Sequence, residues 1–173
     1  MTKISQTINK GITLAERGDY PKALDTFRGL HNKHPENPDV LYNYGRLLND
    51  LRFFIEASSI LQKLVEIDPG YRNAKVALAF TFLHLNKSEE AEKLLEEACI
   101  TDPDNTFLLR NLGSIYAKRE EFEKALELFR RAEQIEPNSR PTLYGIALAL
   151  FKQERMSEAS EYLSKIIDQD VND

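Results

Sequence analysis

The chain has 173 residues, of which 42% are hydrophobic and 29% charged, and its formal net charge is −5. A chain of this length buries roughly 70% of its unfolded surface, which is enough for one continuous core. The acidic balance excludes nonspecific nucleic-acid binding, which needs a basic surface, and no apolar run approaches the ~20 residues that span a bilayer.

The sequence repeats itself every 34 residues. One column of the repeat is always alanine, at Ala23, Ala57, Ala91, Ala125 and Ala159. Four copies have proline near their end, at Pro35, Pro69, Pro103 and Pro137. The fifth copy has Val171 at this position. Two further columns are uniformly small (Gly11, Gly45, Ala79, Gly113, Ala147) and uniformly large and apolar (Phe27, Leu61, Leu95, Phe129, Leu163). This agreement predicts five repeats, at residues 4–37, 38–71, 72–105, 106–139 and 140–173.

The first repeat, residues 4–37, is irregular. Its first helix carries the polar Thr7 and Lys10 where later copies have Leu or Tyr, as expected of a terminal repeat that caps the stack. The run Gly-Asp-Tyr-Pro at residues 18–21 predicts the turn into the second helix. His31 and His34 lie near the end of that helix, where we attribute them to the helix dipole. Because no third ligand accompanies them, we predict no metal site.

The second repeat, residues 38–71, has an unusual turn between its helices. Asn37 and Pro38 predict a capped helix start. Arg52 and Phe53 then occupy the turn that holds Gly-Asp in the first repeat. Phe53 and Ile55 fall outside the buried columns, so we expect both to be partly exposed. They either pack locally against the next turn or mark an interface.

The last three repeats differ mainly in their surfaces. The second helix of the third repeat, residues 72–105, is rich in glutamate, and we interpret this as a solvated outer face. The fourth repeat, residues 106–139, is the clearest: Gly113 permits a close approach of helices, and Pro137 stops the second one. In the fifth, Ile166 and Ile167 have no following helix to cover them. We expect this end to continue in a longer protein or to pair with a second copy.

No catalytic arrangement is present. The sequence has no nucleophile elbow, no phosphate-binding glycine loop and no Cys/His cluster, so we predict a protein that is not an enzyme and has no cofactor. The single cysteine, Cys99, excludes an internal disulfide, and we interpret it as a packing residue. Residues 1–10 lack the apolar run of a signal peptide, so we expect a cytoplasmic protein.

The fixed 34-residue period with its small and large columns resembles the tetratricopeptide repeat (TPR). The signature positions in the fourth copy are Leu109, Leu112, Gly113, Tyr116, Ala125, Phe129, Ala132 and Pro137. The family's tryptophan is replaced by leucine, at Leu41, Leu109 and Leu143. The resemblance implies an all-α fold: a right-handed superhelix (solenoid) of antiparallel helix hairpins, forming a single domain over residues 1–173.

In this family the first helix of each repeat lines a concave groove that binds peptides. The corresponding positions predict a peptide-binding groove here, formed by Asn9, Tyr42, Asn43, Arg46, Asn73, Val76, Phe80, His84, Phe107, Arg110, Asn111, Ser114, Lys118 and Tyr144. Further positions that correspond to the family's groove include Glu16, Asp50, Leu83 and Lys152.

Three features of this predicted groove carry chemistry. Asn9, Asn43 and Asn111 share one column, and their amides resemble the asparagine ladder with which some members hold a peptide backbone; simple inheritance of the family's preferred residue is the alternative. Val76, Phe80 and Leu83 form an apolar patch, which either contacts a peptide or packs against neighbouring helices. The charges are polarised, with acids such as Glu16, Asp39 and Asp50 toward the N-terminal end and Arg110, Lys118 and Lys152 toward the C-terminal end.

The function that follows is a protein-interaction scaffold that binds a peptide segment of a partner protein. The clamp with which some members bind the carboxylate of chaperone tails is missing, because only Asn43 matches its columns. Two alternatives stay open: a self-assembling scaffold that uses exposed ends of the solenoid, and a regulatory repeat domain of a larger protein. We expect no nucleic acid and no membrane insertion among its interactions.

Overall fold

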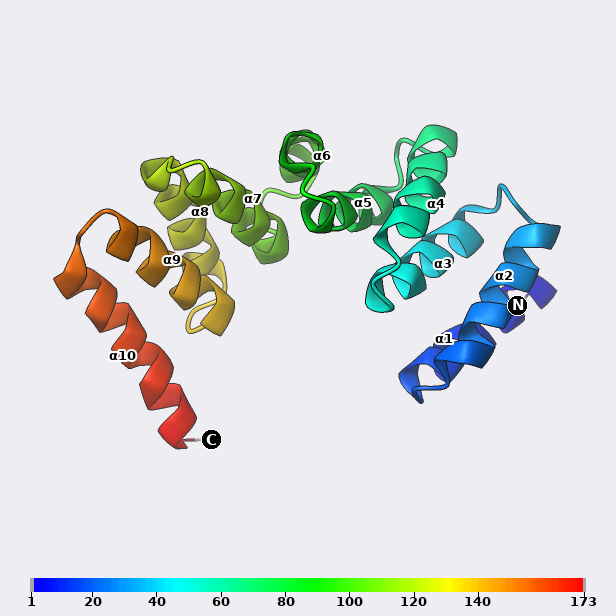
Figure 1. Ribbon diagram of the computed structural model, residues 1–173, viewed down its shortest axis with the longest axis horizontal. Coiled ribbons are helices and arrows are strands. Elements are labelled where there is room, and N and C mark those ends of the chain that lie inside the picture. The colour runs from blue at the N-terminus through cyan, green and yellow to red at the C-terminus, as the bar shows by residue number, and fades with distance from the viewer. Residues whose placement is uncertain (1, 173) are drawn as a thin grey trace. The chain divides into compact units, whose positions relative to one another are not determined.

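The computed structural model describes residues 2–172, which form ten helices joined as five consecutive antiparallel pairs (Figure 1). The helices are α1 (Lys3–Glu16), α2 (Tyr20–Lys33), α3 (Pro38–Asp50), α4 (Phe54–Ile67), α5 (Arg72–His84), α6 (Ser88–Thr101), α7 (Thr106–Lys118), α8 (Phe122–Ile135), α9 (Arg140–Lys152) and α10 (Met156–Asn172). No strand occurs in these residues, so the predicted all-α class is confirmed. Each pair falls within one predicted repeat to within a residue.

The chain divides into two compact units, residues 1–94 and 95–173, with the division inside α6. Each unit has its own apolar core. In the first unit, Phe27, Val40, Leu48 and Ala57 are among the buried residues at the α1–α4 contacts. In the second, Leu126, Phe129, Ile146 and Leu150 are buried where α8, α9 and α10 meet. Among residues 2–172, no helix is long and apolar enough to cross a membrane.

The small and large columns of the sequence are contacts between the two helices of one repeat. A Cβ atom added at Gly11 would lie 2.7 Å from the Phe27 ring, and one at Gly45 would lie 2.6 Å from Leu61. At Gly113 the distance to the Phe129 ring would be 3.0 Å, which confirms the close approach expected there. These glycines let the first helix lie directly against a large side chain of the second.

A buried polar contact connects α3 to α5 in the first unit. The Thr81 hydroxyl lies 2.9 Å from Asn49 Oδ1 and 2.8 Å from the carbonyl oxygen of Ala77. Asn49 Nδ2 donates to the same carbonyl at 3.3 Å. Because Asn49 and Thr81 are both buried, each needs such partners to offset the loss of water. The first helices α3 and α5 are therefore joined by hydrogen bonds.

Two expectations about exposed apolar residues are confirmed. Phe53 is 49% exposed and Ile55 is 78% exposed, both beside the turn between α3 and α4. On α10, Ile167 is exposed, whereas Ile166 is only half-exposed. His31 lies in the last turn of α2, as expected. Its imidazole also packs 5.8 Å from the Tyr44 ring, measured between centroids, and burial lowers its pKa.

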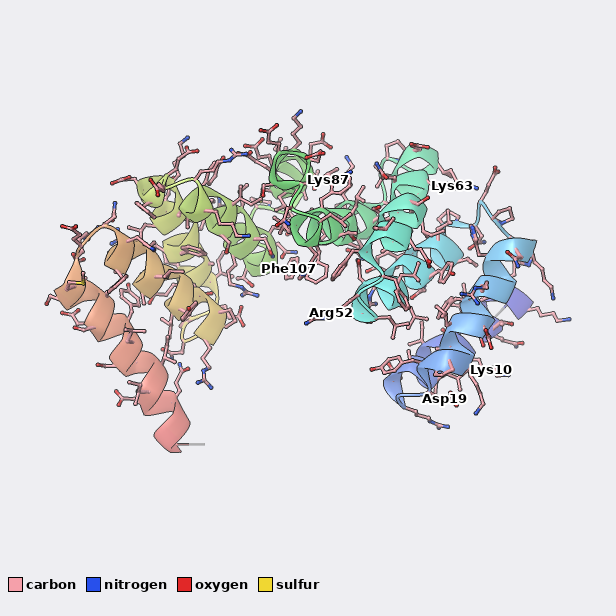
Figure 2. All side chains as sticks on the ribbon, viewed as in Figure 1. Lys10, Asp19, Arg52, Lys63, Lys87 and Phe107 are labelled. Atoms are coloured by element: carbon pink, nitrogen blue, oxygen red, sulfur yellow. The ribbon has the colours of Figure 1, made fainter. Side chains whose placement is uncertain are left out.

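All five turns within the repeats use one left-handed residue. Gly18 has φ +79°, and the corresponding residues Arg52, Asn86, Glu120 and Glu154 have φ values of 62°, 58°, 64° and 60°. The residue after each of these donates a backbone hydrogen bond to the preceding helix, as Phe53 does to Leu48 at 2.8 Å. Figure 2 shows Asp19 and Arg52 in the first two of these turns. Only the first repeat places glycine at the strained position.

Replacing Arg52 by glycine should stabilise the chain. A left-handed conformation costs a residue with a Cβ atom about 1–2 kcal/mol, and glycine's greater freedom in the unfolded chain returns about 0.5–1 kcal/mol of that. We expect Arg52→Gly to raise the free energy of unfolding by about 0.5–1 kcal/mol in urea denaturation. Arg52→Ala removes the same charge but keeps the Cβ atom, and should give no gain. An equal gain in both variants would contradict the prediction.

The lowered pKa of His31 makes stability depend on pH. Burial is the larger cause and the positive charge of Lys63 the second. The folded state therefore binds the proton less readily than the unfolded chain. The stability associated with neutral His31 is fully present above its pKa in the unfolded chain, about 6.5. It is lost as pH falls from there through the lower pKa that His31 has in the folded state.

We expect His31→Phe to flatten the free energy of unfolding between about pH 7 and pH 5, because phenylalanine keeps the contact with Tyr44 but does not titrate. Urea denaturation at a series of pH values measures this slope. Asn32→Gln, in the last turn of the same helix, is the control, because it changes an exposed side chain that does not titrate, and it should keep the slope of the wild type. An unchanged slope in His31→Phe would refute the assignment.

Candidate functional site

The fourteen residues predicted to form the groove all lie on the first helices of the repeats. Eight are on α1, α3 and α5 of the first unit, and six are on α7 and α9 of the second. Two hollows gather some of them, one in each unit. Asn43 and Arg46 line the first hollow, and Ser114, Lys118 and Tyr144 line the second. The remaining nine line neither hollow: Asn9, Tyr42, Asn73, Val76, Phe80, His84, Phe107, Arg110 and Asn111.

The first hollow lies between α1, α2 and α3 and has a volume of about 310 Å³. Its charged lining residues are Glu16, Asp50 and Arg46. Neither acid takes part in an ion pair with the residues that the structure describes. The Arg46 guanidinium lies over the Tyr42 ring, 5.7 Å from its centroid. The hollow is therefore predominantly acidic and contains one arginine.

Aromatic side chains of the first unit pack mainly on one another. His84 stacks on Phe54 with ring centroids 4.4 Å apart, and Phe80 meets His84 edge-on at the same distance. Tyr42 of α3 packs against Tyr71, with ring centroids 5.2 Å apart. Burial raises the pKa of Tyr71 to about 12, and the negative charge of Asp39 adds to the effect. These contacts hold the rings in place, and half-exposed edges of Phe80 and Tyr42 still face solvent.

The second hollow lies between α7, α8 and α9 and has a volume of about 450 Å³. Phe122 and Phe129 of α8 line it together with Tyr144 and Leu148 of α9, which are 59% and 42% exposed. Its charged lining residues are Lys118, Lys152 and Glu120. Neither lysine forms an ion pair with any described residue. This hollow combines solvent-exposed apolar surface with two unpaired positive charges.

Gly145 of α9, which lines the second hollow, lies directly against the Phe129 ring. A Cβ atom at this position would lie 2.7 Å from the Phe129 ring, which also touches Gly113 on α7. The ring therefore fits between two first helices that both lack a side chain at the contact. In the first hollow the corresponding residue is Asn43.

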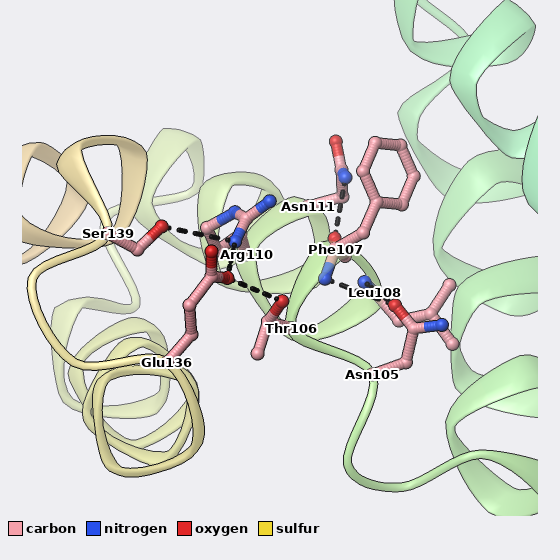
Figure 3. A network of polar contacts seen from close by, with 8 residues as sticks. All are labelled: Asn105, Thr106, Phe107, Leu108, Arg110, Asn111, Glu136 and Ser139. Carbon is pink, nitrogen blue, oxygen red and sulfur yellow. Dashed lines mark hydrogen bonds and ion pairs between the residues drawn. The ribbon is translucent and has the colours of Figure 1, made fainter.

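Arg110 belongs to a polar network that connects α7 to the loop before α9 (Figure 3). Arg110 Nη1 donates to Glu136 Oε2 at 3.0 Å and to Ser139 Oγ at 3.4 Å. The Thr106 hydroxyl donates to the same Glu136 oxygen at 2.9 Å. At the start of α7, Asn105 Oδ1 accepts from the backbone N–H of Phe107 at 3.1 Å. Arg110 thus connects α7 to Ser139, which directly precedes α9, and its charge is paired with that of Glu136.

The asparagines of the predicted ladder bind their own helices. Asn43 Nδ2 donates to the carbonyl oxygen of Asp39 at 2.8 Å, and Asn111 Nδ2 donates to that of Phe107 at 2.7 Å. Each amide keeps its oxygen and one N–H for another partner. Asn9 is exposed on α1.

Leu148, Gly145 and Phe122 were not among the predicted groove residues. The repeat register of the sequence could have identified them. They occupy the same repeat columns as Arg46, Asn43 and Tyr20, which line the first hollow. The two hollows are in fact the same place in different repeats. Lining residues at equivalent positions include the pairs Glu16 and Lys118, and Asp50 and Lys152.

Comparison with known families agrees with this architecture. Two family profiles described as tetratricopeptide repeat match residues 8–72 and 54–112, and a profile described as anaphase-promoting complex, cyclosome, subunit 3 matches residues 84–166. Together they cover most of the chain. The chain belongs to the tetratricopeptide-repeat proteins.

Its relatives are longer proteins of several kinds. Anaphase-promoting complex subunit 3 of Schizosaccharomyces pombe is 23% identical over 155 residues, which are 90% of this chain and 23% of that protein. Human interferon-induced protein with tetratricopeptide repeats 2 is 34% identical over 68% of this chain and 26% of its own length. The TPR repeat-containing protein YpiA of Bacillus subtilis is 24% identical, with 43% of its length matched. The chain spans less than half the length of each of these relatives.

Solved structures of MamA share the fold. A MamA structure from Desulfovibrio magneticus RS-1 has a TM-score of 0.88 at 19% identity, covering 99% of this chain and 97% of that chain. A second MamA crystal structure has a TM-score of 0.82 at 22% identity, covering 94% and 95%. At these identities the similarity establishes a common TPR solenoid fold.

Gly145→Ala should destabilise the second unit. The new methyl group would overlap the buried Phe129 ring, and overpacking of this kind costs about 1–3 kcal/mol. Gly29→Ala is the matched control, since nothing lies within 4 Å of a Cβ atom at this helical position, and alanine there should add about 0.5–1 kcal/mol. Thermal and urea denaturation of both variants test this. Equal effects in the two would show that Gly145 does not support the Phe129 contact.

Proposed function

We propose that this chain is a non-enzymatic scaffold that binds a peptide segment of a partner protein on its first helices, with the α7–α9 hollow as the principal subsite. The observation that carries this proposal is the exposed apolar surface of Tyr144 and Leu148, which line the same hollow as Phe122 and two lysines without ion-pair partners among the described residues. Such a surface offers burial to an incoming apolar side chain.

The size and composition of the hollow support a side-chain subsite. Its volume of about 450 Å³ falls within the roughly 300–1,000 Å³ of ligand pockets, and its lining is apolar with a few polar groups. Full burial of one large apolar side chain contributes about 1.5–3 kcal/mol. Aromatic residues such as Tyr144 are frequent centres of binding energy at interfaces.

The polar groups of the first helices would serve a peptide backbone. Asn43 and Asn111 each retain an amide oxygen and one N–H after bonding to their own helix. A peptide with unpaired backbone groups needs such donors and acceptors. The ladder of asparagines remains part of the proposal, with the hollow as the stronger anchor.

The relatives are compatible with a binding role. The fission-yeast relative is by its name a subunit of a multiprotein complex. A human relative named protein O-mannosyl-transferase TMTC1 is an enzyme by name, but only 15% of its length matches this chain. Its transferase activity is therefore not carried over.

A quantitative pull-down from host lysate tests the proposal. Leu148→Asp places a charge in the hollow and should reduce capture of a specific partner at least tenfold, since it forfeits the apolar burial. Ile135→Asp is the matched control: Ile135 is 41% exposed at the end of α8 and lines neither hollow. Circular dichroism should show equal helicity in both variants. A partner that binds Leu148→Asp as well as the wild type would place the interaction elsewhere.

A further inference from the structure

The rims of the two equivalent hollows carry opposite charges. Glu16 and Asp50, the last residues of α1 and α3, line the first hollow and are called here the acidic rim pair. Lys118 and Lys152, the last residues of α7 and α9, line the second and are called the basic rim pair. All four are exposed at the same position of their repeats. The helix framework is the same in both, and the charge is reversed.

We propose that the basic rim pair makes the α7–α9 hollow specific for a segment in which an apolar side chain is flanked by aspartate or glutamate. The proposal rests on the proposed function and names the class of its ligand. The apolar side chain would lie on Tyr144, Leu148 and Phe122, and the flanking carboxylates would reach Lys118 and Lys152.

The fold itself does not require lysine at these positions. A lysine at a helix C-terminus interacts favourably with the helix dipole, which would be a sufficient reason for its presence. The same position in α1 and α3, however, carries acids, which that dipole disfavours, and those helices still form. The charge at this position is therefore free to vary with the ligand.

The charges around the second hollow also leave the basic rim pair available. Several other cations of the second unit are engaged in ion pairs: Arg110 with Glu136, Arg131 with Asp104, Arg155 with Glu158 and Lys165 with Glu133. Lys118 and Lys152 have no such partner among the described residues, and Glu120 is the one acid that lines the hollow with them. The lining has a net positive charge, which attracts an acidic segment and repels a basic one.

The first hollow would reject the same segment. It presents two acids in place of the two lysines, so the net charge of its lining is negative, and it has the charged Arg46 where the second hollow has the apolar Leu148. One chain thus contains a binding hollow and an equivalent hollow of opposite charge, which serves as an internal comparison.

A displayed library of random 16-residue peptides, panned against the full chain, supplies the probes. Peptides that lose binding in Leu148→Asp are synthesised with a fluorescent label and titrated by fluorescence anisotropy. We expect these peptides to carry Asp or Glu beside an apolar residue. The double variant Lys118→Glu, Lys152→Glu should weaken them about tenfold, with a smaller difference at high salt, since it replaces two attractions by repulsions.

The charge-matched control is Lys93→Glu, Arg130→Glu, which alters two exposed cations that line neither hollow and should leave the affinity unchanged. Leu148-dependent peptides without acidic residues, with basic residues, or with equal affinity for the Lys118→Glu, Lys152→Glu variant would overturn the charge assignment and leave the proposed function standing. If no selected peptide depends on Leu148, the proposed function fails and the charge assignment fails with it.

Discussion

The structure depends on one contact, seen in the first, second and fourth repeats, between a glycine of the first helix and a large side chain of the second. A Cβ atom at Gly11, Gly45 or Gly113 would lie 2.7, 2.6 or 3.0 Å from Phe27, Leu61 or Phe129, respectively, which is closer than ordinary van der Waals contact. This contact fixes how closely the two helices of a hairpin approach. Because interiors are packed as tightly as crystals, a larger residue at one of these glycines would force the facing side chain or its helix to move.

The same contact creates the candidate site. Phe129 extends past Gly113 to Gly145 of the next repeat, so one ring joins α7, α8 and α9. Packing uses one face of each first helix and leaves the other face to solvent, where Tyr144 and Leu148 remain exposed. The hollow is therefore a consequence of regular packing, and its chemistry is decided by the residues that packing does not use.

Much of this could be predicted from the sequence, because the repeat columns record packing directly. The period gave the helix pairs and the close approach at Gly113, and columns outside the core correctly indicated the exposure of Phe53 and Ile55. Contacts made by flexible polar side chains could not be found in this way. Arg110 pairs with Glu136 across a loop, and Asn43 bonds to its own helix, choices that depend on rotamers and distances. At Arg52 the backbone could not be predicted from the local residue type. The turn keeps the left-handed conformation of the other repeats although Arg52 is not a glycine.

A repeat protein separates stability from specificity by position. The columns that hold the hairpins together vary little from copy to copy, whereas the last residue of the first helix changes from Glu16 and Asp50 to Lys118 and Lys152 with the same helical structure around it. Exposed charges contribute little to folding, so reversing them costs the fold little. They act strongly on whatever approaches the hollow, because a charged rim favours one partner and repels another. The positions least important for folding are thus the ones best placed to decide which segment is bound.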